Sequence, residues 1–302
     1  MRQRHPRRGR QGSRALNEAA FVAALRALAG DPAARGLDDD AAVLEFGGES
    51  LVLTHDTMVQ GVHVREDEDL ADVAWKLIAV NLSDLAAKGA KPLGVLVSHM
   101  LGEGDERFVR GLREILEAYD VALLGGDTVR AEGRRAWGCT AIGRASHTPV
   151  PDRRRAQAGD GVYVTGVLGR AMLGFEDRGS GSADDLAYRR PQPLLAEGRM
   201  LAPVVSAMMD VSDGLLLDCW RLAKASQCTF RLESTRIPVA DPARASDCMR
   251  WGDDYQLLFT AAPDAQLPVA ASRIGQVDAA GIPALLLDGQ ILTPEEGLGY
   301  QH

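Results

Sequence analysis

The sequence predicts an α+β protein of two domains, and three observations lead to this expectation. Helix-like and strand-like segments follow one another without a regular βαβ repeat, which disfavours a doubly wound parallel sheet. The chain has 302 residues, a length typical of two domains. Residues 145–160 are polar, with two prolines and three consecutive arginines. We therefore expect this segment to join an N-terminal domain at 15–147 to a C-terminal domain at 148–302.

The N-terminal domain is expected to begin with a helix at 15–28 and a β-hairpin. Apolar segments at 41–46 and 51–53 flank Gly47-Gly48, an arrangement typical of two strands joined by a tight turn. Residues 69–88 repeat apolar side chains at helical spacing and stop before a glycine, as helices commonly do. The other elements expected in this domain are strand 93–100, helix 105–119, strand 121–124 and strand 137–142.

The C-terminal domain is expected to combine short strands with helices. Residues 161–166 form its first expected strand, and the small, polar residues 176–185 are typical of a mobile loop. The other expected elements are helix 194–201, strand 207–211, helix 214–224 and strands at 256–261, 272–277 and 284–287.

Composition and charge restrict the partners and the cellular location. Residues 1–14 hold six arginines and no acid, so they contribute +6 to the net charge of −8 and the remaining chain carries −14. We interpret this tail as a disordered extension, with an arm that contacts RNA or a membrane as the alternative. The acidic body disfavours a nucleic-acid partner, and no apolar run approaches the 18 residues of a membrane span. Four scattered cysteines without CxxC spacing disfavour a disulfide scaffold and fit the reducing cytoplasm.

Several aspartates lie at positions where an acidic side chain is unusual. Each has an ordinary explanation by itself, such as a helix cap for Asp213, a turn for Asp127 or an ion pair between Asp84 and Lys88 one helical turn further on. The aspartates in question follow a strand, begin one, bracket a strand-to-helix turn or lie among apolar helix residues: Asp40, Asp56, Asp84, Asp127, Asp210 and Asp213.

Taken together, these acids point to phosphate chemistry assisted by metal ions. Acids at strand ends and helix starts tend to meet at one rim of a sheet, where they repel one another unless cations neutralise them. Carboxylate and hydroxyl oxygens suit Mg²⁺, which bridges to substrate phosphates. Gly125 and Gly126 before Asp127 offer backbone N–H groups to a phosphate. Neither a P-loop nor the motifs of protein kinases occur in the sequence.

The order of six motifs resembles the thiamine-monophosphate kinase family. This family belongs to a superfamily that includes aminoimidazole ribonucleotide synthetase and selenide water dikinase. The resemblance runs from about residue 36 to the C-terminus. The matching strings are DDAAVL at 39–44, DTMVQGVH at 56–63, AVNLSDLAAKGA at 79–90, GGDT at 125–128, DVSDGL at 210–215 and GDDYQL at 252–257.

The resemblance implies a fold, a reaction and partners. The first domain would form a β-barrel shared with a second copy in a homodimer, and the second would be an α/β sandwich. The γ-phosphoryl group of ATP would pass directly to thiamine monophosphate, with several Mg²⁺ ions and no acid or base catalyst. The acceptor is an ionised phosphate, so the obstacle is repulsion between anions, which metal ions and in-line positioning reduce.

The resemblance also implies site residues, position by position. The metal-binding set would be Asp40, Thr54, Asp56, Asp84, Asp127, Asp210 and Asp213. ATP contacts would come from Gly126, Asp127, Arg144 and Ser212, and contacts to thiamine monophosphate from His63, Asp253 and Tyr300.

Four positions depart from the family pattern, and the alternatives follow from them. Asp38 and Trp251 replace glycines, His55 replaces a small hydroxyl residue, and Asp253 replaces a glutamate. One alternative is another ATP-dependent enzyme of the superfamily, although no cysteine precedes Cys139 as a selenide dikinase would require. The other alternative is a non-catalytic relative that binds nucleotide and metal.

Overall fold

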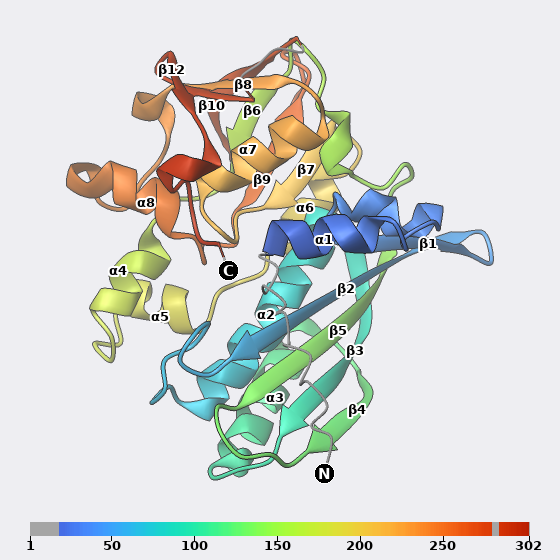
Figure 1. The fold of residues 1–302 in the computed structure, drawn as a ribbon, viewed down its shortest axis with the longest axis vertical. Helices are drawn as coiled ribbons and strands as arrows, with labels where there is room; N and C mark the ends of the chain where they lie inside the picture. Colours follow the sequence, from blue (N-terminus) through green and yellow to red (C-terminus); the bar gives the residue numbers. More distant parts are fainter. Residues whose placement is uncertain (1–17, 280–283, 302) are drawn as a thin grey trace, which may run out of the picture.

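The protein consists of two lobes, each built around its own sheet, in a computed structural model that describes residues 18–279 and 284–301 (Figure 1). The expected two-domain α+β architecture is therefore confirmed. The expected tail at 1–14 lies outside the described residues. The segment 146–160 joins the last strand of the first sheet to the first strand of the second, and the expected boundary between 147 and 148 falls within it.

The N-terminal lobe is an open five-stranded sheet with two helices, α2 and α3, on one face. The strand order is β1-β2-β5-β3-β4, antiparallel except for the parallel pair β3–β4. Helix α2 packs on β2, β3 and β5, and α3 packs on α2 (Figure 1). The elements are α1 (Glu18–Arg26), β1 (Ala42–Phe46), β2 (Glu49–Val59), α2 (Leu70–Ala87), β3 (Ala90–Met100), α3 (Asp105–Tyr119), β4 (Leu123–Val129) and β5 (Ala136–Ala145).

Helix α2 is apolar nearly all round because it lies at the centre of the molecule. It contacts the first sheet, α3 and, from the second lobe, α6 (Leu195–Leu201) and β7 (Ala207–Asp210). A helix buried on all sides loses the one-sided pattern of a surface helix. Its contact with α6 depends on Gly198, because a Cβ there would lie 2.0 Å from the carbonyl oxygen of Ala86.

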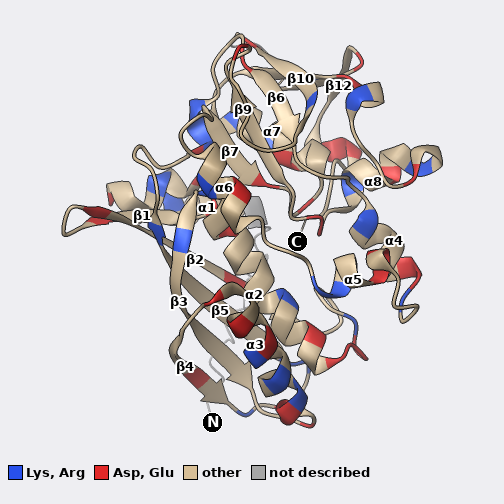
Figure 2. Ribbon diagram, turned by 180° about the vertical axis from the view of Figure 1, so that it is seen from behind, with Lys and Arg blue, Asp and Glu red and all other residues tan. Residues whose placement is uncertain are grey.

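The C-terminal lobe holds a seven-stranded sheet of order β12-β11-β8-β10-β6-β9-β7, in which only β8 and β11 run parallel. Its remaining elements are β6 (Gly161–Val164), α4 (Arg170–Glu176), α5 (Ala183–Arg189), α7 (Leu215–Ala225), β8 (Thr229–Leu232), α8 (Ala245–Trp251), β9 (Leu257–Ala261), β10 (Ser272–Asp278), β11 (Leu285–Leu287) and β12 (Gln290–Leu292). Figure 2 shows acidic and basic residues intermixed on α3, α4 and α8.

The two faces of the second sheet belong to different cores. Met208 and Phe259 pack into the core that includes α2, whereas Met209 and Leu258 pack into the core around α7. Side chains alternate between the faces of a strand. Asp210 therefore lies on the same face of β7 as Met208, which directs its carboxylate toward α2.

The structure corrects several details of the expected elements. Residues 176–185 are not one loop, because they include the end of α4 and the start of α5. The strand expected at 121–124 is β4, which begins later and contains Gly125, Gly126 and Asp127 within it. The elements α4, α5, α8, β8 and β12 were not expected. Segments of three to seven residues show little periodicity, although other elements of the same length, such as α6 and β7, were expected.

Candidate active site

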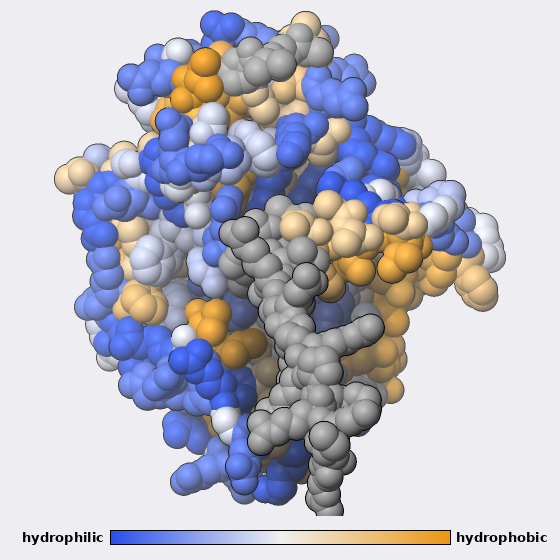
Figure 3. Space-filling model, in the orientation of Figure 1, coloured by the Kyte–Doolittle hydropathy of each residue, from blue (hydrophilic) through white to orange (hydrophobic). Residues whose placement is uncertain are grey.

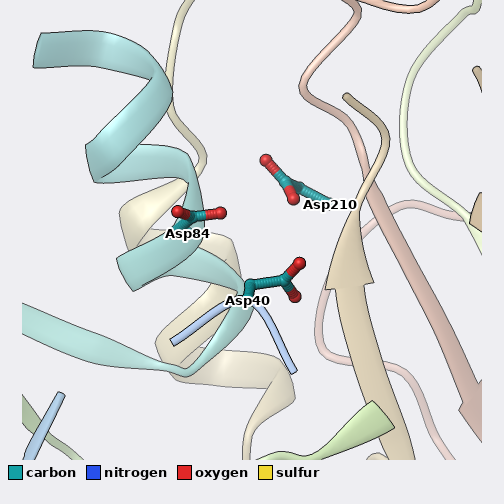
Figure 4. A group of neighbouring side chains, drawn as sticks. All are labelled: Asp40, Asp84 and Asp210. Atoms are coloured by element: carbon teal, nitrogen blue, oxygen red, sulfur yellow. The ribbon is translucent and has the colours of Figure 1, made fainter. Parts of the chain in front are cut away.

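Three carboxylates from distant parts of the chain converge between the lobes (Figure 4). Asp40 precedes β1, Asp84 lies in the last turns of α2, and Asp210 ends β7. One oxygen of each lies within 4.8 Å of the others. The site therefore forms only when β7 of the second lobe packs against α2 of the first.

Hydroxyl groups hold two of these carboxylates in place. The Thr54 hydroxyl on β2 donates a hydrogen bond to Asp84 Oδ2. The Ser83 hydroxyl donates to Asp210 Oδ2 at 2.5 Å and so connects α2 to the second lobe. Thr54 and Asp84, both members of the expected metal-binding set, are therefore in direct contact.

Asp56 on β2 and the aspartates Asp84 and Asp210 of this cluster repel one another. Burial, together with the charges of Asp210 and Asp213, raises the pKa of Asp56 to about 6. The pKa of Asp84 lies well above its ordinary value because of burial and the charges of Asp56 and Asp210. Burial also raises the pKa of Asp210. Carboxylates in such a cluster ionise together only when cations are present, and an oxygen-only donor set fits Mg²⁺.

The neighbouring corner of the site, formed by Asp39 and Asp40, is already paired with cations of the chain. Arg35 Nη1 lies 2.5 Å from Asp39 Oδ2. Lys88 Nζ contacts Asp39 and lies 3.2 Å from Asp40 Oδ2. The Arg153 guanidinium binds both oxygens of Asp40, with 3.1 Å between Nε and Oδ2. The alternative pairing of Lys88 with Asp84 is wrong, because Lys88 makes its ion pairs with Asp39 and Asp40.

Ser212 and Asp213 lie in the turn between β7 and α7, beside the carboxylate cluster. Their backbone N–H groups both donate to Asp218 Oδ2 at 3.1 Å. Asp218 is fully buried, and burial and the charge of Asp213 raise its pKa to about 7. The Asp213 carboxylate pairs with Arg221. This turn is therefore fixed by a buried acid that the sequence did not single out.

The expected substrate residues Asp253 and Tyr300 meet the same turn. Asp253 N–H donates to the Ser212 carbonyl at 2.8 Å, and Tyr300 N–H donates to the Asp213 carbonyl at 2.9 Å. Asp253 has a φ of 58°, a left-handed backbone conformation that residues other than glycine rarely adopt. The structure thus brings these two residues, which lie far apart in the sequence from Ser212, to one side of the site.

Lys76 on α2 is a buried partner of Asp253 that the sequence did not reveal. Its Nζ lies 2.6 Å from Asp253 Oδ2, and the side chain is 3% exposed. The Tyr255 hydroxyl donates to the other oxygen of the carboxylate at 2.9 Å. The Lys76 ammonium also lies 4.2 Å from the centre of the Tyr188 ring. An ion pair between the lobes therefore orients Asp253.

Four expected site residues lie elsewhere on the N-terminal lobe. Gly126 and Asp127 are on the edge strand β4, with β3 and β5 between them and β2. Strand β4, which carries Asp127, is three strand spacings from β2, which carries Asp56, so the two strands lie roughly 14 Å apart. Gly126 and Asp127 therefore lie away from the carboxylate cluster. Arg144 pairs with Glu49 at 2.9 Å. His63 Nδ1 accepts a hydrogen bond from the backbone N–H of Val59 at 3.0 Å.

His55, the departure next to Asp56, does not enter the site. Its ring nitrogens contact the hydroxyl groups of Thr140 at 2.8 Å and Thr57 at 3.3 Å. Side chains alternate along β2, so His55 lies on the open face of the sheet while Asp56 faces α2. The substitution at His55 therefore leaves the carboxylates untouched.

Comparison with known proteins places this site in context. Residues 38–145 match the AIR synthase related protein, N-terminal domain, and residues 157–286 match its C-terminal domain. The chain is 36% identical to thiamine-monophosphate kinase of Caulobacter vibrioides, with 90% of this chain and 86% of the relative covered. It is 33% identical to the enzyme of the same name in Escherichia coli strain K12, with 88% and 86% covered.

Solved structures give the same result. The structure described as "AaThiL complexed with AMPPCP and TMP" has a TM-score of 0.86 at 26% identity, with 97% of this chain and all of the other covered. Thiamine-monophosphate kinase of Stenotrophomonas maltophilia K279a has a TM-score of 0.74 at 33% identity, with 90% and 96% covered.

Proposed function

Because this chain belongs to the thiamine-monophosphate kinase family, we propose that it transfers the γ-phosphoryl group of ATP to thiamine monophosphate, giving thiamine diphosphate. The observation that carries this function is the convergence of Asp40, Asp84 and Asp210 between the lobes. A related structure of the same fold holds both AMPPCP and TMP. The chain is thus a kinase that uses ATP as co-substrate.

Several Mg²⁺ ions would be held by the carboxylates of the site. Asp56, Asp84 and Asp210 make no direct salt bridge with a Lys or Arg among the described residues, and the charge of Lys88 offsets only part of the rise in the pKa of Asp84 and Asp210. Thr54 adds a hydroxyl oxygen. Asp40 and Asp213 border this group, whereas the metal role of Asp127 remains a prediction from its motif. Bound Mg²⁺ would neutralise the phosphate oxygens of both substrates.

The chain itself would position the two substrates. The acceptor phosphate is ionised at neutral pH, so no residue needs to remove a proton. Ser212 would contact ATP, while Asp253, held by Lys76 and Tyr255, would contact thiamine monophosphate together with Tyr300. The roles of Gly126 and Arg144 toward ATP and of His63 toward the acceptor rest on the motifs alone.

A homodimer would cover the open face of the first sheet. Leu44, Phe46 and Leu96 lie on the face opposite α2 and are 42%, 70% and 39% exposed. Figure 3 shows apolar residues exposed beside β1 and β2. Within the described residues this sheet is not closed, and a second copy packed on it would complete the expected barrel. Dimerisation would remove these apolar side chains from water.

A cytoplasmic enzyme is the accompanying proposal. All four cysteines are buried and free, as a reducing compartment allows. None of the helices in residues 18–279 or 284–301 is long and apolar enough to cross a membrane.

One assay separates this function from its alternatives. The full chain is incubated with ATP and Mg²⁺ together with thiamine, thiamine monophosphate or an aminoimidazole ribonucleotide precursor, and the products are separated by chromatography. Thiamine diphosphate should form from the monophosphate only. Turnover of another acceptor would support a different enzyme of the superfamily, and nucleotide binding without turnover would support a non-catalytic relative. Asp84→Asn is the control for a contaminating kinase.

A further inference from the structure

Three aromatic rings of the second lobe form a continuous row that ends next to the segment carrying Asp253. Phe175 on α4 is at the centre of this row. Its ring centre lies 5.3 Å from that of Tyr188 on α5 and 5.2 Å from that of Trp251, the last residue of α8. The planes of Phe175 and Tyr188 meet at 81°, an edge-to-face contact that aromatic pairs favour. The aromatic row therefore joins α4, α5 and α8 (Figure 1).

Two cations of the first lobe lie over this row. The Lys76 ammonium lies 4.2 Å from the centre of the Tyr188 ring. The guanidinium carbon of Arg65 lies 5.0 Å from the centre of the Phe175 ring. Both distances are within the range of a cation–π interaction, which is stronger where the cation is shielded from water, as the buried Lys76 is. The aromatic row therefore connects the two lobes beside the ion pair between Lys76 and Asp253.

These contacts form a closed circuit that begins and ends at the segment carrying Asp253. Trp251 contacts Phe175, and Phe175 contacts Tyr188. Tyr188 in turn contacts Lys76. Lys76 pairs with Asp253, which lies only two residues after Trp251 in the chain. Each member of the circuit therefore limits where its neighbours can lie.

The backbone of residues 252–255 needs contacts of this kind. Asp253 and Tyr255 have φ values of 58° and 49°. This left-handed conformation is unfavourable for residues with a side chain, and it persists where the surrounding structure holds it. The Asp253 carboxylate is held by an ion pair and a hydrogen bond, and the Trp251 ring holds the preceding backbone against α4. Asp253 is therefore fixed through both its side chain and its backbone.

We propose that Trp251 is a positioning residue for the acceptor, because it holds Asp253 in place through the aromatic row. The inference rests on the proposed function, in which Asp253 contacts thiamine monophosphate. The family pattern has a glycine at position 251 and a glutamate at position 253. An aspartate has one side-chain torsion fewer than a glutamate, so it can compensate less for a displaced backbone. Trp251 supplies packing that a glycine would not, at the point where the shorter acid depends on it.

The test compares KM for thiamine monophosphate with KM for ATP in the full chain carrying Trp251→Ala. One aromatic contact contributes enough to change KM for thiamine monophosphate between about twofold and tenfold, while KM for ATP should stay near its natural value. Trp251→Phe keeps a ring beside Phe175 and should recover most of the loss. Trp220→Ala is the matched control, because this partly buried tryptophan of α7 contacts Lys224 instead. It should leave the ratio of the two constants unchanged.

A double substitution separates positioning of Asp253 from packing in general. Trp251→Ala should raise KM for thiamine monophosphate in the natural chain but cause no further rise in a chain that carries Asp253→Asn. If Trp251→Ala does not fold, Phe175→Leu removes the centre of the aromatic row and should give the same pattern. An unchanged KM, equal changes for both substrates, or the same fold-change with and without Asp253→Asn would overturn the proposal while the proposed function stands. A natural chain that does not phosphorylate thiamine monophosphate would refute the proposed function, and this inference with it.

Discussion

Substitution of Asp56 should stabilise the metal-free protein while removing its response to metal. Burial and the charges of Asp210 and Asp213 raise the pKa of Asp56 from 3.8 to about 6. Above pH 6 the Asp56 carboxyl is ionised in both the folded and the unfolded chain, but its ionisation costs more free energy in the folded chain. This difference in pKa corresponds to roughly 3 kcal/mol of lost stability. Asp56→Asn keeps the size of the side chain and removes this loss.

The sign and the pH range follow from the same pKa. The folded carboxyl binds its proton more tightly than the unfolded one, so the stability of the natural protein decreases as the pH rises from about 4 through 6. In EDTA, Asp56→Asn should raise the free energy of unfolding by roughly 3 kcal/mol at pH 8 and by roughly half as much at pH 5. Urea unfolding followed by circular dichroism measures both values.

A matched substitution tests the reasoning in the opposite direction. The Arg189 hydrogen bond lowers the pKa of Asp185 to about 2, so Asp185→Asn should destabilise the protein at pH 8. In Mg²⁺, the natural protein should gain stability that Asp56→Asn lacks. If Asp56→Asn lowers the stability in EDTA at pH 8 as Asp185→Asn does, the carboxylates of the site do not repel one another, and the argument for a metal site loses its basis.

Four other substitutions or conditions test the site and the fold. Asp84→Asn should lower kcat on the order of 100-fold or more in a coupled ATPase assay while the circular dichroism spectrum is unchanged; near-natural kcat would contradict its metal role. AMPPCP should raise the melting temperature with Mg²⁺ but not in EDTA. Lys76→Met should raise KM for thiamine monophosphate severalfold more than KM for ATP, because Asp253 loses its partner; equal changes in both constants would contradict this role. Gly198→Ala should destabilise the fold by roughly 1–3 kcal/mol in urea, because its Cβ would approach the carbonyl oxygen of Ala86 to 2.0 Å.

The carboxylates of the site could be predicted because their sequence surroundings were unusual for an acid. Asp84 lies among apolar residues of a helix, and Asp210 lies at the end of a strand, just before a turn. The partners of these acids could not be predicted in the same way. Lys88 is four residues from Asp84, a spacing that favours an ion pair on an isolated helix. The structure instead directs Lys88 to Asp39 and Asp40, since loops distant in sequence bring better partners to the end of the helix.

The location of Asp127 shows a second limit of sequence reasoning. Its Gly-Gly-Asp motif indicates phosphate contact, but the sheet order β2-β5-β3-β4 decides how far it lies from Asp56. That order depends on pairing between strands distant in sequence, which local patterns do not encode. Helix α2 was predicted from its apolar spacing and β3 from a continuous apolar run. The seven-residue helices α4, α5 and α8 offered two turns at most.

The end of α2 explains why one helical turn holds both an acid that needs a cation and a lysine that provides one. The last carbonyl groups of a helix carry partial negative charge, which favours Lys88 and disfavours an ionised Asp84. Burial adds to the cost of charge at Asp84, and the Thr54 hydroxyl and the charge of Lys88 offset only part of it. The fold therefore stabilises Lys88 and its corner in the absence of ligands and leaves Asp84 in need of a cation from outside. A site arranged in this way should remain folded without metal and bind it most strongly where the two phosphate groups must meet.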